Sequence, residues 1–280
     1  MAVVTMDIKK MVESEYPRYF IGKIGISALN MNVAVENVLA RINASSPGYI
    51  CVSNVRTVVL AQKDPEFCKI QNSSFMTVPD GMPLVWYAHM GNLDYVGKVS
   101  GPDLMDNILS ISIEYNLSHY FYGSTIDVLS KMNRNLKNRF NGICIKGMHS
   151  PPFRPLRPEE KQMVLDEINR TKPSIVWVGL GAPKQEYWMY EMIDKIDSAL
   201  LIGVGAAFIF AADEVKRPHP FIRNMGLEWL FRCIQQPITA RRFIYPFFYF
   251  NGMLMKQFWR HVWRDRLGWR CHTQGRNGDR

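Results

Sequence analysis

Apolar and polar positions follow two alternating patterns along the chain. Short, nearly continuous apolar runs are separated by longer segments in which apolar residues recur every three or four positions. The runs are typical of strands buried on both faces, and the longer segments of amphipathic helices. We therefore predict strands at 19–27, 49–54, 119–123, 142–150, 173–181 and 199–207, and helices at 32–43, 57–73 (with a break), 101–116, 124–140, 157–171 and 183–196.

Alternating strands and helices predict an α/β fold: a mainly parallel, Rossmann-like sheet covered by helices on both faces. With 280 residues, 47% of them hydrophobic, the chain is long enough to bury a core as one large domain or as two. The charged, proline-containing segment "DEVKRPHP" at 213–220 indicates a boundary. We expect an α/β core at 1–213 and a helical appendage at 214–280.

The positive charge of the chain is concentrated in this appendage. The net charge is +9, yet from Val215 onward there are 13 Lys and Arg against three Asp and Glu, so the preceding part is nearly neutral. Aromatic residues alternate with the basic ones in "RRFIYPFFYF" and "QFWRHVW". This favours contact with an anionic membrane surface. Binding of single-stranded nucleic acid, or an ordinary solvated amphipathic helix, are the alternatives.

Cysteine usage and the apolar stretches suggest where the chain resides. The five cysteines form no CxxC pair and no Cys/His cluster, which predicts a reducing, cytoplasmic environment and no metal site. The N-terminal segment contains acidic residues and lacks a long apolar core, so we expect no secretory signal. The longest apolar stretches fall short of the roughly 18 to 20 residues that span a bilayer, so we expect no membrane crossing.

Two predicted strand–helix junctions are candidates for ligand binding. Ligands of such sheets bind at the carboxyl ends of the strands. Gly123 and Ser124 stand where one strand passes into a helix, and Gly181 stands at another such junction, so both turns offer backbone N–H groups to a phosphate or hydroxyl group. The structural alternative for each is a tight turn and helix cap. Neither matches a dinucleotide-binding or Walker motif, and we predict no cofactor.

The stretch "VPDGMPLVW" at 78–86 raises a separate question about Asp80. A Pro-Asp-Gly sequence before an apolar helix is typical of a turn and N-cap. A carboxylate at the end of a strand is also suited to act as a general base. The two roles are compatible, and this stretch alone does not decide between them.

Four segments together resemble the WecG/TagA/CpsF family of bacterial glycosyltransferases. They are "VPDGMPLVW", "YFYGSTIDVLSKM", "VGLGAPKQEYW" and the discontinuous "IGVGAAF…VKRPHPF…GLEWLFRC", and the resemblance runs from about Asn54 to about Arg242. It implies inverting transfer of a sugar, usually from a UDP-linked donor, to a polyprenyl-diphosphate-linked sugar at the inner face of the membrane. Such enzymes serve the synthesis of surface or exopolysaccharides.

The resemblance also implies roles for individual residues. Asp80 matches the family's general base, Gln185 lies in the same pocket, and Asn54 lines it. Arg232 and Arg242 match arginines that steady the diphosphate, and Arg217 is a further candidate. The sequence has no DxD motif to hold a metal on the diphosphate, so forked arginine donors are the natural replacement.

Two other functions stay open at this point. A membrane-associated scaffold of a polysaccharide assembly complex would bind UDP without turning it over. An RNA-binding protein would use the basic appendage, although no nucleic-acid motif accompanies it, and we expect no nucleic-acid partner. The sequence does not identify the sugar, and it leaves a homo-oligomer open.

Overall fold

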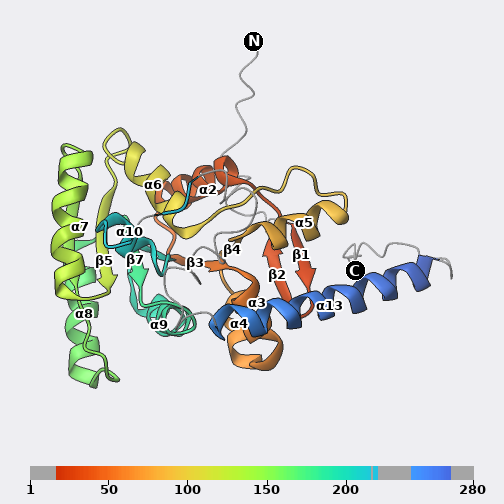
Figure 1. The fold of residues 1–280 in the computed structure, drawn as a ribbon. Helices are drawn as coiled ribbons and strands as arrows, with labels where there is room; N and C mark the ends of the chain where they lie inside the picture. Colours follow the sequence, from red (N-terminus) through yellow and green to blue (C-terminus); the bar gives the residue numbers. More distant parts are fainter. Residues whose placement is uncertain (1–16, 216, 220–240, 266–280) are drawn as a thin grey trace, which may run out of the picture.

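A six-stranded parallel sheet lies at the centre of the molecule (Figure 1). The computed structural model describes residues 17–215, 217–219 and 241–265, with the backbone alone at 241–243 and 257–265. From one edge to the other the strands are β4 (Met76–Pro79), β3 (Gly48–Ser53), β8 (Leu200–Gly203), β7 (Ile175–Gly179), β5 (Ser118–Gly123) and β6 (Cys144–His149). All neighbouring pairs are parallel. Their carboxyl ends therefore meet at one edge.

Successive residues of each central strand enter different hydrophobic clusters. On β7, Ile175 and Trp177 join the cluster on one face, and Val176 and Val178 join the cluster on the other. Side chains of a strand point alternately to the two faces, so a strand buried on both must be apolar throughout. Burial on both faces therefore explains the uninterrupted apolar runs in the sequence.

Helices cover both faces, as the sequence pattern predicts. One face is covered by α2 (Met31–Asn43), α6 (Gly101–Ile111), α7 (Ile126–Arg139) and α10 (Ala207–Ala211). The other is covered by α8 (Pro158–Thr171) and α9 (Lys184–Met192), which continues into the short 3₁₀ helix η1 (Ile193–Lys195). The prediction of an α/β fold with a mainly parallel sheet is confirmed.

The prediction of a single strand at 19–27 is wrong. This segment is a hairpin of β1 (Arg18–Ile21) and β2 (Ile24–Ser27), paired antiparallel outside the main sheet. Gly22 has φ +63°, which glycine adopts without steric cost, and the chain reverses there. The amide of Lys23 donates to Gln62 Oε1 at 3.0 Å, which ties the turn to the neighbouring helix.

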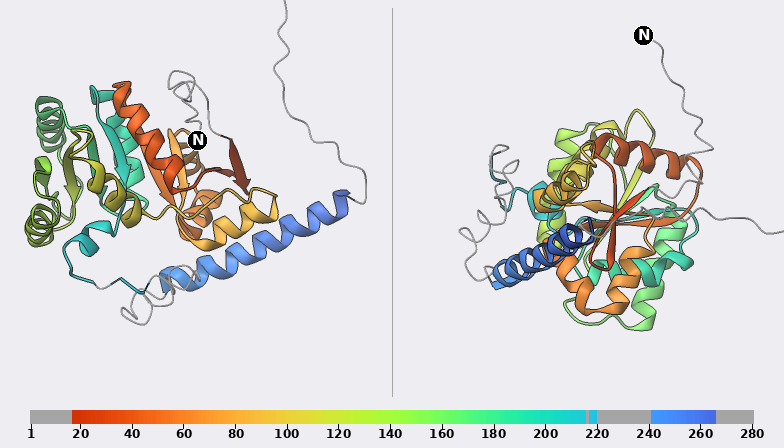
Figure 2. Two further views of the ribbon diagram at one scale, coloured as in Figure 1. Left: turned by 90° about the horizontal axis from the view of Figure 1, so that it is seen from above. Right: turned by 90° about the vertical axis from the view of Figure 1, so that its right-hand side faces the viewer.

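A third hydrophobic cluster joins this hairpin to α3 (Val55–Lys63), α4 (Pro65–Asn72), α5 (Met82–Met90) and the C-terminal helix α13 (Arg241–Asp265). Phe250 of α13 is 1% exposed within this cluster. Lys63 of α3 lies over the ring of Tyr245, 4.4 Å from its centroid. Figure 2 shows α13 extending beyond the core as a long rod. Residues 241–265 of the predicted appendage are therefore helical, and this helix packs against α3.

A helix that spans a bilayer must be both long and apolar. Across 17–215, 217–219 and 241–265, none combines the required length with the required apolar character.

Candidate functional site at the carboxyl edge of the sheet

The register of the sheet determines which predicted site residues are neighbours. Ser53 of β3 pairs with Pro79 of β4, so the residues that follow them, Asn54 and Asp80, lie next to each other at the carboxyl edge. Further along the edge, Gly123 of β5 pairs with Gly179 of β7. The edge thus gathers residues that are more than 120 positions apart in the sequence.

Asp80 stands two positions before the start of α5 and is half-buried. Its backbone N–H donates to the carbonyl oxygen of Ser53 at 2.7 Å, which fixes it beside the end of β3. The N-cap residue of α5 is Gly81, with φ +116°. The interpretation of Asp80 as the N-cap is therefore wrong. Gly81 forms the turn, and a residue with a side chain would be strained at its positive φ.

Asn54 caps the neighbouring helix α3. Its Oδ1 accepts hydrogen bonds from the backbone N–H groups of Arg56 at 3.0 Å and Thr57 at 3.3 Å. Thr57 Oγ1 accepts in return from the backbone N–H of Asn54 at 2.8 Å, which completes a capping box. Since the carbonyl oxygen of the amide holds the cap, its nitrogen is the part of Asn54 suited to a ligand.

The turns after β5 and β7 are built from backbone in the left-handed region. Gly123 has φ +131°, and a Cβ there would lie 2.6 Å from the carbonyl carbon of Gly179, so the two strand ends touch through their backbones. Ser124 follows with φ +62°, which is uncommon for a residue with a side chain. Its carbonyl oxygen accepts from Ser150 Oγ at 2.7 Å. Gly181 has φ +76°, and no atom lies within 4 Å of its ideal Cβ position.

Gln185, in the first turn of α9, is only 3% exposed. Its Oε1 accepts from the backbone N–H of Gly181 at 3.1 Å, and its Nε2 donates to Glu186 Oε1 at 3.0 Å. Its amide also lies against Gly203, where a Cβ would come within 3.0 Å of Nε2. The structure thus shows Gln185 bracing the turn after β7.

Glu186 is a residue to which sequence reasoning gave no role. It is fully buried, and burial raises the pKa of its carboxyl group to about 7. Its position in the first turn of α9 is readable from the sequence, but its burial is not. No sequence signal distinguishes this glutamate from the exposed Glu191 one and a half turns later.

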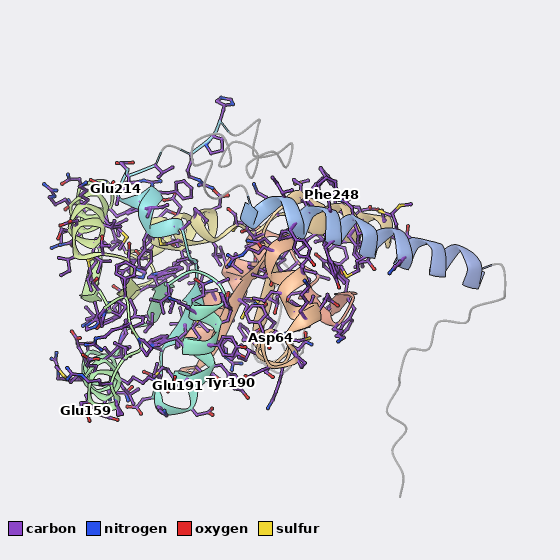
Figure 3. The ribbon with its side chains drawn as sticks, turned by 60° about the horizontal axis from the view of Figure 1, so that its bottom comes forward. Asp64, Glu159, Tyr190, Glu191, Glu214 and Phe248 are labelled. Carbon is purple, nitrogen blue, oxygen red and sulfur yellow. The ribbon has the colours of Figure 1, made fainter. Side chains whose placement is uncertain are left out.

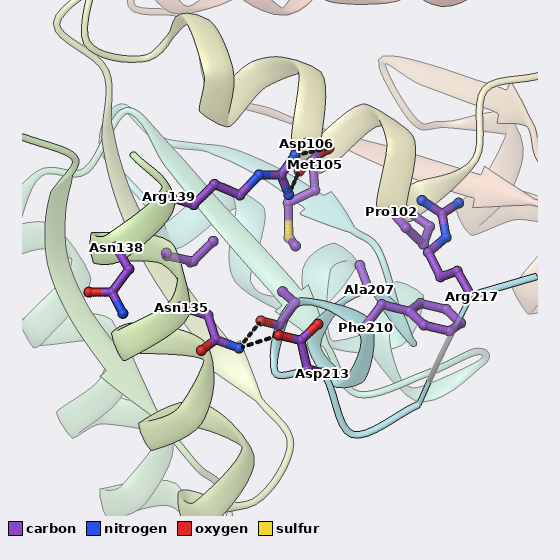
Figure 4. Close-up of a pocket in the computed structure, with 12 residues that line it drawn as sticks. Pro102, Met105, Asp106, Asn135, Asn138, Arg139, Ala207, Phe210, Asp213 and Arg217 are labelled. Carbon is purple, nitrogen blue, oxygen red and sulfur yellow. Dashed lines mark hydrogen bonds and ion pairs between the residues drawn. The ribbon is translucent and has the colours of Figure 1, made fainter. Parts of the chain in front are cut away.

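Arg217 lies beside a different pocket, between α6, α7 and α10 (Figure 4). Its Nη1 donates to Asp103 Oδ1 at 2.8 Å, and its guanidinium lies 5.5 Å from the ring centroid of Phe210. Nε and Nη2 are buried without a hydrogen-bond partner among the described residues. Asp103, the partner 114 positions away, is a second residue that sequence reasoning missed.

Ser124 lines another pocket, of about 390 Å³, together with Gly179, Pro183, Lys184 and residues of the loop after β6. The structure therefore does not bring Ser124 and Arg217 into one pocket. Of the remaining predicted arginines, Arg232 lies outside the described residues, and Arg242 belongs to α13 with its side chain undescribed. Among the described side chains, no group of three or more His, Cys, Asp or Glu gathers as metal ligands.

Comparison with known proteins gives a consistent result. The model of the glycosyl transferase WecG/TagA/CpsF family matches residues 19–264. The chain is similar to the N-acetylglucosaminyldiphosphoundecaprenol N-acetyl-beta-D-mannosaminyltransferase of Bacillus spizizenii, with 25% identity over 203 residues, 72% of this chain and 77% of the relative. It is equally similar to the protein of the same name from Bacillus subtilis, with 25% identity over 195 residues, 70% of this chain and 74% of the relative.

Proposed function

Since the chain belongs to the WecG/TagA/CpsF family of glycosyl transferases, we propose that it transfers a sugar from a UDP-sugar to a polyprenyl-diphosphate-linked sugar, with inversion at the anomeric carbon. The observation that carries this proposal is the carboxyl edge itself. It places the half-buried carboxylate of Asp80 on the same edge as two turns built from left-handed backbone. The names of the relatives, which specify a diphosphoundecaprenol acceptor, support the lipid-linked substrate.

In the proposed reaction Asp80 acts as the general base. It takes the proton of the acceptor hydroxyl while that oxygen attacks the anomeric carbon from the face opposite the leaving group. The new C–O bond forms as the bond between the anomeric carbon and UDP breaks, and UDP departs with the electron pair. A single displacement of this kind inverts the anomeric centre. It needs one carboxylate.

The leaving diphosphate needs donors that stabilise its negative charge. The turns after β5 and β7 offer backbone N–H groups at the starts of α7 and α9, where the helix dipole favours an anion. The N–H of Gly181 is not among them, because it donates to Gln185 Oε1. We assign further neutralisation to Arg232 and Arg242. Arg217, which pairs with Asp103 beside a separate pocket, is not given this role. With arginines in this role the reaction requires no metal ion.

Incubation with an undecaprenyl-diphosphate-linked N-acetylglucosamine acceptor and a panel of UDP-sugars tests the proposal. We expect UDP release from at least one donor, dependent on the acceptor. A scaffold that binds UDP without turnover would release none from any donor, and that result would contradict the proposal.

We further propose that α13 holds the protein on the inner face of the cell membrane, as a peripheral protein. In this arrangement residues 1–213 form the catalytic core and residues 214–280 the membrane-associating part. Its described outer face is rich in exposed apolar side chains, and Phe248, labelled in Figure 3, is 71% exposed. Aromatic rings of this kind settle at headgroup depth, and the basic residues of the helix attract anionic lipids.

Flotation with anionic liposomes measures this contact. Phe248→Asp should reduce the bound fraction severalfold, because a carboxylate replaces an apolar anchor and repels the lipid headgroups. Met163→Asp is a matched control, since Met163 of α8 is also 71% exposed but lies away from α13. Equal binding by both variants would contradict the assignment of the membrane surface to α13.

A further inference from the structure

The buried carboxyl group of Glu186 is unusual because only one of its two oxygens is paired. Oε1 accepts from Gln185 Nε2, whereas Oε2 is buried without a hydrogen-bond partner among the described residues. A buried carboxylate oxygen without a partner destabilises the fold, so its presence calls for a specific explanation.

The chemistry of the pair restricts how the amide of Gln185 is turned. An ionised carboxylate only accepts hydrogen bonds, so the amide must present Nε2 to Glu186. Its other end, Oε1, then faces the backbone N–H of Gly181, as observed at 3.1 Å. If the amide were reversed, Nε2 would face the N–H of Gly181, donor against donor. Glu186 therefore selects the orientation in which Gln185 holds the turn.

We propose that Glu186 is a positioning residue of the candidate site: it orients the amide of Gln185, and through it fixes the Gly181 turn that receives the donor diphosphate. The assignment of the turn to the diphosphate rests on the proposed function. The hold on the turn itself rests on the hydrogen bonds described above.

A dependence on pH follows from this arrangement. A protonated Glu186 can donate its own O–H to Gln185 Oε1, which permits the reversed amide and loosens the turn. The charged group that faces Glu186 from α3 is Arg56, which favours the ionised carboxylate, and the titratable group that faces it from β3 is the buried thiol of Cys51. With the carboxyl pKa at about 7, the turn should tighten as the pH rises through neutrality.

Hydrogen–deuterium exchange of the Gly181 amide tests the positioning role without any ligand. Glu186→Leu removes the acceptor, and we expect exchange to accelerate about tenfold at pH 8, the size of one lost hydrogen bond. Glu186→Gln keeps an acceptor and should stay within about threefold of wild type. Glu167→Gln is the control, because Glu167 accepts from Tyr120 Oη at 2.7 Å away from the turn. Unchanged exchange in a folded Glu186→Leu protein would overturn the proposal.

UDP affinity measured from pH 6 to 8 provides the second readout. At each pH the affinity of Glu186→Gln for UDP is divided by that of the wild type. The ionisation of UDP affects both proteins equally and cancels in this ratio. We expect the wild type alone to gain affinity across neutrality, so that the ratio changes severalfold. A constant ratio would overturn the pH dependence even if Glu186→Leu does not fold. Absence of UDP binding by the wild type would instead contradict the proposed function, and the exchange measurement would still decide the role of Glu186.

Discussion

The two halves of the carboxyl edge are built from different chemical groups. The half formed by β4 and β3 ends in polar side chains, Asp80 and Asn54, which the paired strands place side by side. The half formed by β7 and β5 ends in left-handed backbone at Gly123, Ser124 and Gly181. Proton transfer requires a side chain that titrates, whereas an extended anion is best held by N–H groups of the backbone. We therefore assign the acid–base step to the half formed by β4 and β3, and binding of the diphosphate to the half formed by β7 and β5.

The end of β8 lies between the two halves, and its role there is to leave room for a neighbouring side chain. Gly203 leaves room for the amide of Gln185, and a Cβ at that position would lie within 3.0 Å of Nε2. The buried pair of Gln185 and Glu186 therefore occupies the centre of the edge, beneath the turn that it holds.

Removing the carboxylate of Asp80 should produce the largest effect. Asp80→Asn keeps the size of the side chain but cannot accept the proton of the acceptor hydroxyl, so we expect kcat to fall by about 10² to 10⁴. The affinity for UDP should stay within about threefold of the wild-type value, because we assign UDP binding to the half formed by β7 and β5. Steady-state kinetics and calorimetric titration with UDP measure the two quantities. A parallel loss of both would contradict the division of the edge.

Two glycine substitutions should separate steric collision from backbone strain. Gly123→Ala adds a Cβ 2.6 Å from the backbone of Gly179, and we expect the free energy of unfolding to fall by more than about 3 kcal/mol. Gly181→Ala meets no atom within 4 Å, so only its φ of +76° is unfavourable, at about 1 to 2 kcal/mol. Urea denaturation compares them. Equal losses would mean that the contact between β5 and β7 is not what requires glycine.

Stability should also depend on pH through Glu186. Burial raises the pKa of its carboxyl to about 7 from an ordinary value of 4.5, so the folded protein binds more protons than the unfolded chain between these values. The free energy of unfolding should therefore decrease as the pH rises from 4.5 to 7 and level off above, by at most about 3 kcal/mol. Denaturation of wild type and Glu186→Gln across this range isolates the contribution. If the free energy of unfolding changed equally with pH in both proteins, the dependence would come from a group other than Glu186.

Ser124→Gly should have the smallest effect on the fold. Glycine relieves the positive φ of +62° but is more flexible when unfolded, so we expect a net stabilisation of about 0.5 to 1 kcal/mol. Thermal denaturation would detect it as a small rise in Tm. A loss of stability would show that the hydroxyl of Ser124 contributes more than its backbone strain costs.

Much of the fold could be predicted because the pattern of apolar residues has a direct physical cause. Strands buried on both faces must be apolar throughout, and 173–181 was identifiable for that reason. The hairpin at 19–27 was missed because Gly22 lies inside a segment that otherwise has the character of one strand. A single glycine in such a run fits a bulge as well as a reversal.

The candidate site was less accessible to sequence reasoning. Asp80 and Asn54 stand directly after strands and Gly181 stands two residues after one, so their place at the edge followed from a parallel sheet. The contact of Arg217 with Asp103 and the burial of Glu186 depend on how helices pack across the sheet. No periodicity reports such distances, and these two features required the structure.

The most direct test of the division of the carboxyl edge is a crystal structure of the protein with UDP bound. We expect the diphosphate to contact backbone N–H groups of the turns after β5 and β7, other than the Gly181 N–H that Gln185 holds, with Asp80 facing the terminal phosphate, where the sugar would be attached. A diphosphate bound away from both turns, or a terminal phosphate directed away from Asp80, would contradict it.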